Sequence, residues 1–444
     1  MSEMRARPSV WRFAALAGAL VLLSACSIFD AYVPPPLPGE RLSVLSLQQR
    51  IEPDPRIQDV EIRLPRPYAN PSWPQAGGSA ANAMYHLALG DAPRQVWRAS
   101  IGAGSRSDRR ITATPIASAE AVFAMDADGQ VSAVSAANGN RLWRASIVPK
   151  KEDPGAFGGG LAYSQGILFV STGYGEVVAF DAGNGQEIWR QRVGIPIRGA
   201  PTVFSSRVFV IGIDNQLFAL AADDGRTLWN HVGIAESAGL LGSANAVASG
   251  EFVVAPFSSG ELTALRIDNG RPVWSDSLAR AGRVAALGDL SDLNGRPVID
   301  RGTVYALGFG GRMVATDLTS GNRLWSQNIA GTESPWIGGD FLFLITAEQE
   351  IVAVSREDGS IRWVTELPRY EKPDRRDPIK WSGPVLASDR LIVLSSAGNA
   401  LAVSPYSGET LGSLRLPDKA LVPPIIANET LYILTDGGDL VAYR

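Results

Sequence analysis

Short apolar runs with a period of two recur along the chain, each followed by a turn and a second run. In the clearest copy, Val177, Ala179 and Asp181 alternate with Val178 and Phe180. This alternation places one set of side chains on each face of a strand. An acidic residue and a glycine then bracket the turn, because Asp can bond its own backbone and glycine tolerates a positive φ. The pattern predicts paired β-strands.

The same strand motif occurs eight times in the sequence. Its copies lie near positions 131, 177, 217, 262, 313, 351, 401 and 440. Six copies lead to a tryptophan in the next run, namely Trp143, Trp189, Trp229, Trp274, Trp325 and Trp363, whereas Gly412 stands at the seventh such position. Successive tryptophans lie 38 to 51 residues apart. A period of this size predicts a solenoid, a propeller or an array of small domains.

A full repeat contains four apolar runs. In the unit 111–147 these runs are 112–117, 121–125, 130–135 and 141–147. Four antiparallel strands of this length make one blade of a β-propeller. The predicted fold is therefore all-β: an eight-bladed propeller of four-stranded antiparallel blades.

The strand count also predicts how the ring closes. Eight third-strand motifs are followed by only seven fourth-strand positions, so one fourth strand is missing at the end of the chain. The stretch around Trp97 precedes the first blade and looks like the other tryptophan strands. We therefore expect residues 96–101 to complete the eighth blade beside residues 440–443. Such closure removes the exposed edges that a linear array would leave.

The recurring tryptophans, including Trp97, have a packing interpretation and a chemical one. Seven residues at equivalent positions cannot all be catalytic, so we expect them to fill the interfaces between blades. Each would bury roughly 150–250 Å². At about 25 cal/mol per Å² this is a few kcal/mol each, as an upper estimate. Gly412 should leave its interface less tightly filled.

The N-terminal region differs from the repeats. Residues 1–25 combine a basic start with an apolar stretch that is too short for a typical membrane span, so they are predicted to be a signal peptide. The stretch 23–26 resembles a bacterial lipobox, which would make Cys26 the site of lipidation. The alternative is an ordinary signal peptide with an incidental cysteine. Ser27 resembles the outer-membrane class of such lipoproteins.

A proline-rich stretch follows the single cysteine. Residues 26–66 are expected to be the lipidated cysteine and an extended tether, because prolines disfavour regular structure. An apolar run at 42–47 leaves open whether the tether docks on the folded body. Residues 67–444 are predicted to form the propeller, with residues 73–78 packed as a plug or brace.

Composition argues against several classes of function. The formal net charge is −4 and no basic stripe is present, so nucleic acid is not an expected partner. One cysteine cannot make a disulfide or a thiolate metal site within one chain. His86 and His231 lie far apart and have no metal-ligand spacing. The glycine-rich stretches 158–160 and 308–311 do not open a predicted helix, which favours strand turns over phosphate binding. We predict no catalytic residue, cofactor or metal.

The repeats resemble those of pyrroloquinoline-quinone (PQQ) dehydrogenases, whose blades carry the pattern Ala-x-Asp-x-x-x-Gly-x-x-x-Trp. Ala179, Asp181, Gly185 and Trp189 match this pattern in full. The pattern marks the fold strongly and the function weakly. Together with the lipobox, the resemblance narrows to the BamB family of outer-membrane lipoproteins. It covers about residues 90–444 and the signal.

The family resemblance implies a non-enzymatic scaffold on the periplasmic face of the outer membrane. Its implied partners are BamA, other subunits of the β-barrel assembly (BAM) complex and nascent outer-membrane proteins. The rival interpretation is a PQQ enzyme, which typically needs a vicinal disulfide that Cys26 alone cannot supply. A third possibility is an envelope propeller that binds glycan or peptide.

Two segments are similar to BamA-contacting segments of that family. The resemblance assigns partner binding to Ile195, Ile197, Arg198, Asp289, Leu290, Ser291, Asp292 and Asn294. Both segments link a tryptophan strand to the next blade, so both should emerge on the same rim. Long connections in compact domains often carry function. The alternative is that Arg198 is merely solvated and Asp292 caps a turn.

Overall fold

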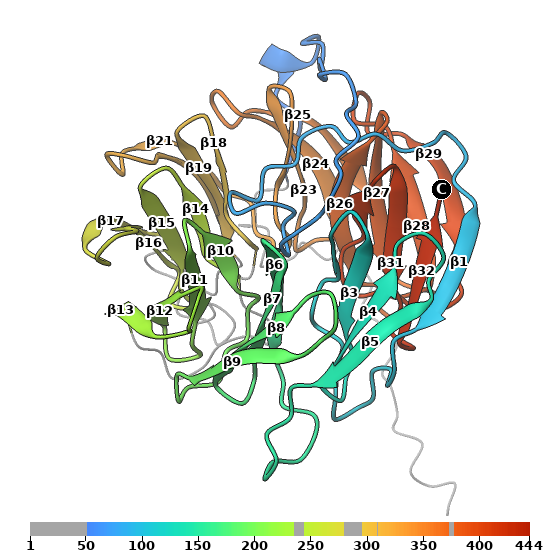
Figure 1. Cartoon of the computed structure of the whole chain (residues 1–444). Helices are drawn as coiled ribbons and strands as arrows, with labels where there is room; N and C mark the ends of the chain where they lie inside the picture. Colours follow the sequence, from blue (N-terminus) through green and yellow to red (C-terminus); the bar gives the residue numbers. More distant parts are fainter. Residues whose placement is uncertain (1–50, 235–243, 279–294, 309, 373–376) are drawn as a thin grey trace, which may run out of the picture. The chain divides into compact units, whose positions relative to one another are not determined.

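The computed structural model describes residues 51–234, 244–278, 295–308, 310–372 and 377–444 (Figure 1). In these ranges the protein forms eight four-stranded antiparallel sheets. A single 3₁₀ turn, η2 (Pro55–Ile57), lies near the start of the described chain. The predicted all-β, eight-bladed propeller is confirmed.

The first four blades follow one another in the chain. Blade 1 contains β2 (Ile116–Ala117), β3 (Ala121–Met125), β4 (Gln130–Ser135) and β5 (Arg141–Ser146); blade 2 contains β6 (Gly159–Ser164), β7 (Ile167–Thr172), β8 (Glu176–Asp181) and β9 (Glu187–Arg192); blade 3 contains β10 (Thr202–Phe204), β11 (Arg207–Ile211), β12 (Gln216–Ala221) and β13 (Thr227–Val232); blade 4 contains β14 (Val247–Ser249), β15 (Phe252–Pro256), β16 (Glu261–Arg266) and β17 (Pro272–Ser277).

The remaining blades continue in the same way until the last. Blade 5 contains β18 (Val298–Asp300), β19 (Thr303–Gly308), β20 (Arg312–Asp317) and β21 (Arg323–Gln327); blade 6 contains β22 (Trp336–Gly338), β23 (Phe341–Ile345), β24 (Glu350–Ser355) and β25 (Ile361–Glu366); blade 7 contains β26 (Trp381–Ala387), β27 (Arg390–Ser395), β28 (Asn399–Val403) and β29 (Thr410–Arg415); blade 8 contains β30 (Ile425–Ala427), β31 (Thr430–Leu434), β32 (Asp439–Tyr443) and the N-terminal β1 (Gln95–Ser100).

Blade 8 joins distant parts of the chain. β1 pairs antiparallel with β32, and Trp97 stands opposite Ala442. The two strands lie side by side in Figure 1, where the blue-cyan β1 flanks the red β32. The predicted closure of the ring by an N-terminal strand is confirmed.

Burial follows the position of a strand within its blade. The second strand of blade 6, β23, is buried at all five positions, because neighbouring sheets cover both of its faces. The outer strand β5 is buried only at Trp143. A continuous apolar run therefore marks an interior strand, and an isolated tryptophan marks an outer one.

Each tryptophan of an outer strand docks on the next blade. Trp143 donates its indole N–H to the carbonyl of Ala182 at 2.8 Å. The ring lies against Gly185, where a Cβ would come within 2.5 Å of it. All seven indoles donate to the following blade: Trp97 to Ala136, Trp143 to Ala182, Trp189 to Ala222, Trp229 to Ile267, Trp274 to Leu318, Trp325 to Arg356 and Trp363 to Pro405. The tryptophans are interface residues, as the repeat pattern predicted.

Gly412 takes the tryptophan position in blade 7, opposite Ala402. A Cβ built on it would meet no atom within 4 Å, in agreement with the expected open interface. The neighbouring blade 8 has no turn between its third and fourth strands, because β32 and β1 come from distant parts of the chain. The docking surface that the other tryptophans use is therefore missing at this seam.

The blades present two different faces. Because successive strands alternate in direction, links between blades and turns between second and third strands emerge together, on what we call the connection face. The other turns emerge on the opposite face. Residues 68–89, which we call the strap, cross that opposite face and bond to Ser388 and Asn428 in its turns. Trp73 in the strap is 2% exposed, as expected for a plug or brace.

The described part of the expected tether lies against blade 6. Asp54 donates its backbone N–H to Ile361 at 2.7 Å, and Arg362 donates its Nε–H to Val60 at 2.8 Å. Ile62 is 4% exposed. The question of docking, which the sequence left open, is thus answered for residues 51–66 by direct contact with the propeller.

Candidate partner-binding face

Three of the residues assigned to partner binding lie on the connection face, in the link between β9 and β10. Ile195 and Arg198 are half-buried. Ile197 forms an isolated bridge with Gly212, and its N–H donates to Thr172 at 3.2 Å. The carbonyl of Arg198 accepts from Gly159 at 2.9 Å. The link is therefore held on both sides by blades 2 and 3.

The side chain of Ile197 is fully buried in the core between blades 2 and 3. The family resemblance assigned this residue to partner binding. Its burial corrects that detail, because a fully covered side chain cannot contact another protein without a shift of the loop. Ile195 and Arg198 remain accessible, and their partner contacts stay a prediction.

Three exposed apolar residues beside this link were missed by the sequence analysis. Ile213, Val232 and Ile234 are 44%, 60% and 63% exposed. The N–H of Ile213 donates to Pro196 at 3.0 Å, so this turn touches the link that carries Ile195. We call Ile195, Ile213, Val232 and Ile234 the isoleucine patch.

Backbone and side-chain bonds hold the patch together. Asn215 donates its side-chain N–H to the carbonyl of Ile234 at 2.7 Å, and its carbonyl accepts from Gly233 at 2.8 Å. Scattered apolar residues are normal on a protein surface, whereas a group of them on fixed loops suggests an interface. A signal for Ile213 existed: the equivalent turn positions in blades 1, 4 and 6 hold Ala127, Ser258 and Ala347.

The remaining assigned residues fall outside the described ranges. These are Cys26, expected to be lipidated, and Asp289, Leu290, Ser291, Asp292 and Asn294 of the second partner-binding segment. By chain order, that segment links β17 of blade 4 to β18 of blade 5. Its contribution to binding stays a prediction.

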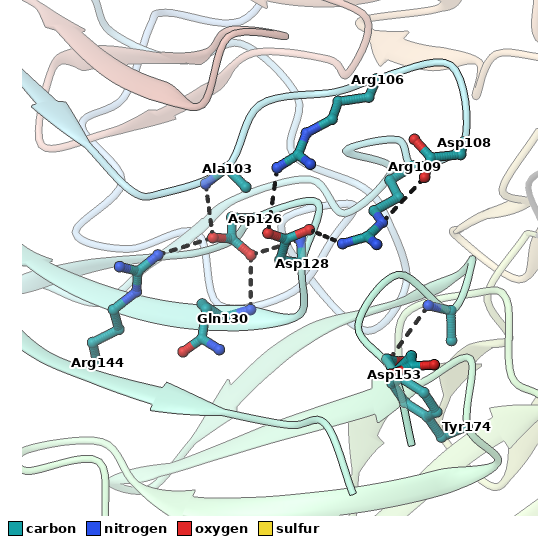
Figure 2. A network of polar contacts seen from close by, with 11 residues as sticks. Ala103, Arg106, Asp108, Arg109, Asp126, Asp128, Gln130, Arg144, Asp153 and Tyr174 are labelled. Atoms are coloured by element: carbon teal, nitrogen blue, oxygen red, sulfur yellow. Dashed lines mark hydrogen bonds and ion pairs between the residues drawn. The ribbon is translucent and has the colours of Figure 1, made fainter. Parts of the chain in front are cut away.

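On the connection face, a polar network joins the link that leaves blade 8 to blade 1 (Figure 2). The link that follows β1 passes over the β3–β4 turn. The carboxylate of Asp126 accepts from the backbone of Ala103 at 2.9 Å and of Gln130 at 2.8 Å. It also pairs with Arg144 at 2.9 Å, and its side chain is 1% exposed. With both oxygens occupied, Asp126 serves structure and is not available as a base or metal ligand.

The rest of the network faces solvent. Asp128 pairs with Arg109 at 2.6 Å and with Arg106 at 3.5 Å. The hydrogen bond with Asp128 raises the pKa of Arg109. Figure 2 also shows Tyr174, which donates its hydroxyl to the carbonyl of Asp153 at 2.7 Å. The Asp128 pairs tie the link after β1 to the β3–β4 turn of blade 1, and the Tyr174 bond ties the link after β5 to the β7–β8 turn of blade 2.

The central channel holds a second group of charges. Arg296 donates its Nε–H to Ser334 at 3.1 Å, and Glu333 accepts from the N–H of Gly383 at 3.3 Å. Burial raises the pKa of Glu333 to about 7, although the Gly383 bond and Arg296 act in the opposite direction. Burial likewise lowers the pKa of Arg296. Both residues are half-buried and line a cavity of about 30 Å³, a size that suits one or two waters.

Both histidines of the chain, His86 and His231, lie within the described ranges. No three His, Cys, Asp or Glu side chains gather there in a way that could hold a metal ion. His231 stacks on Phe257 with ring centroids 6.2 Å apart, and burial lowers its pKa. In the same part of the chain, no helix combines the length and apolar character needed to cross a bilayer.

Comparison with solved structures defines the fold of the protein. The crystal structure of BamB from Moraxella catarrhalis matches with a TM-score of 0.67 at 19% identity, over 80% of this chain and all of that one. A quinohemoprotein alcohol dehydrogenase from Comamonas testosteroni matches with a TM-score of 0.64 at 15% identity, over 84% of this chain and 80% of the other. At such low identity these likenesses show the fold alone, a β-propeller.

Comparison of sequences is more specific. The family model described as outer membrane protein assembly factor BamB matches residues 127–365, more than half of the chain. The chain therefore belongs to the BamB family. A relative from Burkholderia pseudomallei, named outer membrane protein assembly factor BamB, is 25% identical over 356 residues, which cover 79% of this chain and 88% of the relative.

Proposed function

We propose that this protein is a non-enzymatic scaffold in the assembly of outer-membrane β-barrels, and that it binds BamA through the connection face of blades 2 to 4. The observation that carries the proposal is the isoleucine patch beside Arg198, on fixed loops, in a chain of the BamB family. Other subunits of the BAM complex and nascent outer-membrane proteins are further proposed partners.

The chemistry of this face suits a protein partner. Burying an isoleucine side chain stabilises an interface by about 1.5–3 kcal/mol. Arg198 adds a planar fork of donors next to the apolar group, a residue type enriched at binding hot spots. The segment 289–294 carries Asp289 and Asp292 and would add acidic contacts on the same face.

We further propose that Cys26 is lipidated and holds the protein at the periplasmic side of the outer membrane. The lone cysteine at the end of a lipobox-like stretch supports this proposal. An acyl chain contributes about 0.8 kcal/mol per buried CH₂, so several chains together give stable anchoring. The quinoprotein neighbours share only the fold, and we propose no enzymatic role.

The binding site is tested by recovery of BamA on the immobilised full-length protein. Ile213→Ser and Ile234→Ser should each reduce recovery, by about tenfold per 1.4 kcal/mol of lost contact. Arg198→Glu should do the same by reversing a charge at the edge of the patch. Leu324→Ser is the matched control, because Leu324 is 56% exposed on the outer strand β21 of blade 5, outside blades 2 to 4.

Circular dichroism of each variant establishes that the propeller is folded. Undiminished recovery by folded Ile213→Ser and Ile234→Ser would remove the isoleucine patch from the proposal. Equal losses in the Leu324→Ser control would show that surface polarity in general, and not this face, governs recovery.

A further inference from the structure

The strap makes backbone hydrogen bonds with the first strands of several blades. Trp73 and Ala117 exchange both of their backbone bonds, at 2.7 and 2.8 Å, in blade 1. The carbonyl of Pro74 accepts from Tyr163 of blade 2 at 2.7 Å. The carbonyl of Ala80 accepts from Ala248 of blade 4 at 2.8 Å. These bonds occupy backbone groups at the channel-facing edges of the first strands.

Side-chain amides of the strap add contacts with the first strands of blades 3 and 8. Gln75 donates to the carbonyl of Val203 at 2.8 Å and accepts from the Val203 N–H at 3.1 Å, in blade 3. Asn70 donates to Ile426 of blade 8 at 2.6 Å. Each amide is buried. Gln75 reproduces the donor and acceptor of a peptide group, so it pairs with a strand edge as another strand would.

The remaining contacts of the strap are with blades 5, 6 and 7. Ile299 of blade 5 donates to Ala81 at 2.9 Å, and Asn82 donates to Pro297 at 2.8 Å. The indole of Trp336 in blade 6 donates to Tyr85 at 2.7 Å. Leu87 donates to Leu386 of blade 7 at 3.2 Å. The strap thus bonds to the first strand of every blade.

An unpaired strand edge is a ready acceptor for another chain, and eight such edges converge on the channel. We propose that these edges form one binding site for an extended peptide, and that the strap is its ligand in cis. The strap is then attached to the ring twice, once covalently through the chain that leads to β1 and once through its own hydrogen bonds. A force applied to the residues before the strap is then distributed over all eight blades. It does not act directly on β1, the strand that closes the ring.

A cut between the strap and β1 tests this proposal. Asp91 and Ala92 are exposed, so a protease recognition sequence can be placed between them in the full-length protein. After folding and cleavage, an affinity tag placed before the strap should still capture the propeller fragment, with more than nine-tenths retained. Separation of the fragments while the propeller keeps its circular dichroism spectrum would overturn the proposal.

Cleavage of substituted proteins tests the contacts themselves. Gln75→Ala removes two hydrogen bonds to blade 3, which should speed release of the cleaved fragment at least tenfold. Gln191→Ala is the matched control, because Gln191 lies on the outer strand β9 and donates to the adjacent Arg192. Equal release rates for the two variants would show that the amide contact does not hold the strap. If Gln75→Ala does not fold, the cleavage of the otherwise unchanged chain decides the matter alone.

Discussion

The contact between Trp143 and Gly185 gives a sharp test of how the blades are held together. Gly185 has φ +74°, and a Cβ on it would stand 2.5 Å and 2.6 Å from two atoms of the indole ring. Gly166 in the same blade has φ +83°, and a Cβ on it would meet nothing within 4 Å. The two glycines therefore share the backbone requirement and differ in the tryptophan contact.

Alanine at either position adopts a left-handed conformation at a cost of about 1–2 kcal/mol. At Gly185 the added methyl group also overpacks a rigid, buried ring, which costs about 1–3 kcal/mol more. We expect Gly185→Ala to lower the free energy of unfolding by about 1–3 kcal/mol more than Gly166→Ala does. Urea unfolding followed by tryptophan fluorescence measures both variants against the unchanged protein.

A double-mutant cycle assigns the difference to the indole. Trp143→Ala costs about 3–5 kcal/mol by itself, but it removes the ring that the new methyl group would meet. In that background, Gly185→Ala should cost no more than Gly166→Ala, which gives a coupling of about 1–3 kcal/mol. Equal costs for the two glycine substitutions in the unchanged protein would refute the reasoning that the indole is docked rigidly on the turn.

Two further predictions concern pH and anchoring. The folded-state pKa of Glu333 is raised from 4.5 to about 7. Between these two pH values the folded protein therefore binds more protons than the unfolded chain. The free energy of unfolding should fall by on the order of 3 kcal/mol as the pH rises across this range. Urea unfolding at pH 5 and pH 8 should show a smaller fall in the free energy of unfolding for Glu333→Gln than for the unchanged protein. An equal fall in both proteins would contradict the raised pKa of Glu333. Cys26→Ala should move the protein from the membrane fraction to the soluble fraction, and continued membrane retention would argue against lipid anchoring.

The tryptophan positions show why much of the fold could be predicted. A strand buried on both faces needs a continuous apolar run, and each outer strand needs one large side chain for the next blade. Both requirements act within a few residues, so they leave a local pattern that repeats. The one outer strand without a tryptophan among those predicted also follows this rule. Gly412 stands at the interface where the next blade lacks the turn on which an indole would dock.

The candidate site was predicted less well. Ile195 and Ile197 are both isoleucines and lie two positions apart, yet Ile195 is half-buried and Ile197 is fully buried. The difference arises because Ile197 pairs with Gly212, a residue of the next blade. Ile213 and Ile234 become neighbours of Ile195 only through bonds between links and turns, which no periodic pattern records.

By itself, the sequence determined an eight-bladed, ring-closed propeller, because strand periodicity and interface residues are local requirements. The BamB family was indicated by the resemblance of its repeats and its lipobox to known proteins, and not by the periodicity. The tertiary structure alone decided which apolar side chains stay exposed and where residues 51–89 bind. Gln75, for example, pairs with Val203 across 128 positions of the chain. Such a pairing depends on which strand edges meet at the channel, and this is settled only when all eight blades have closed around it.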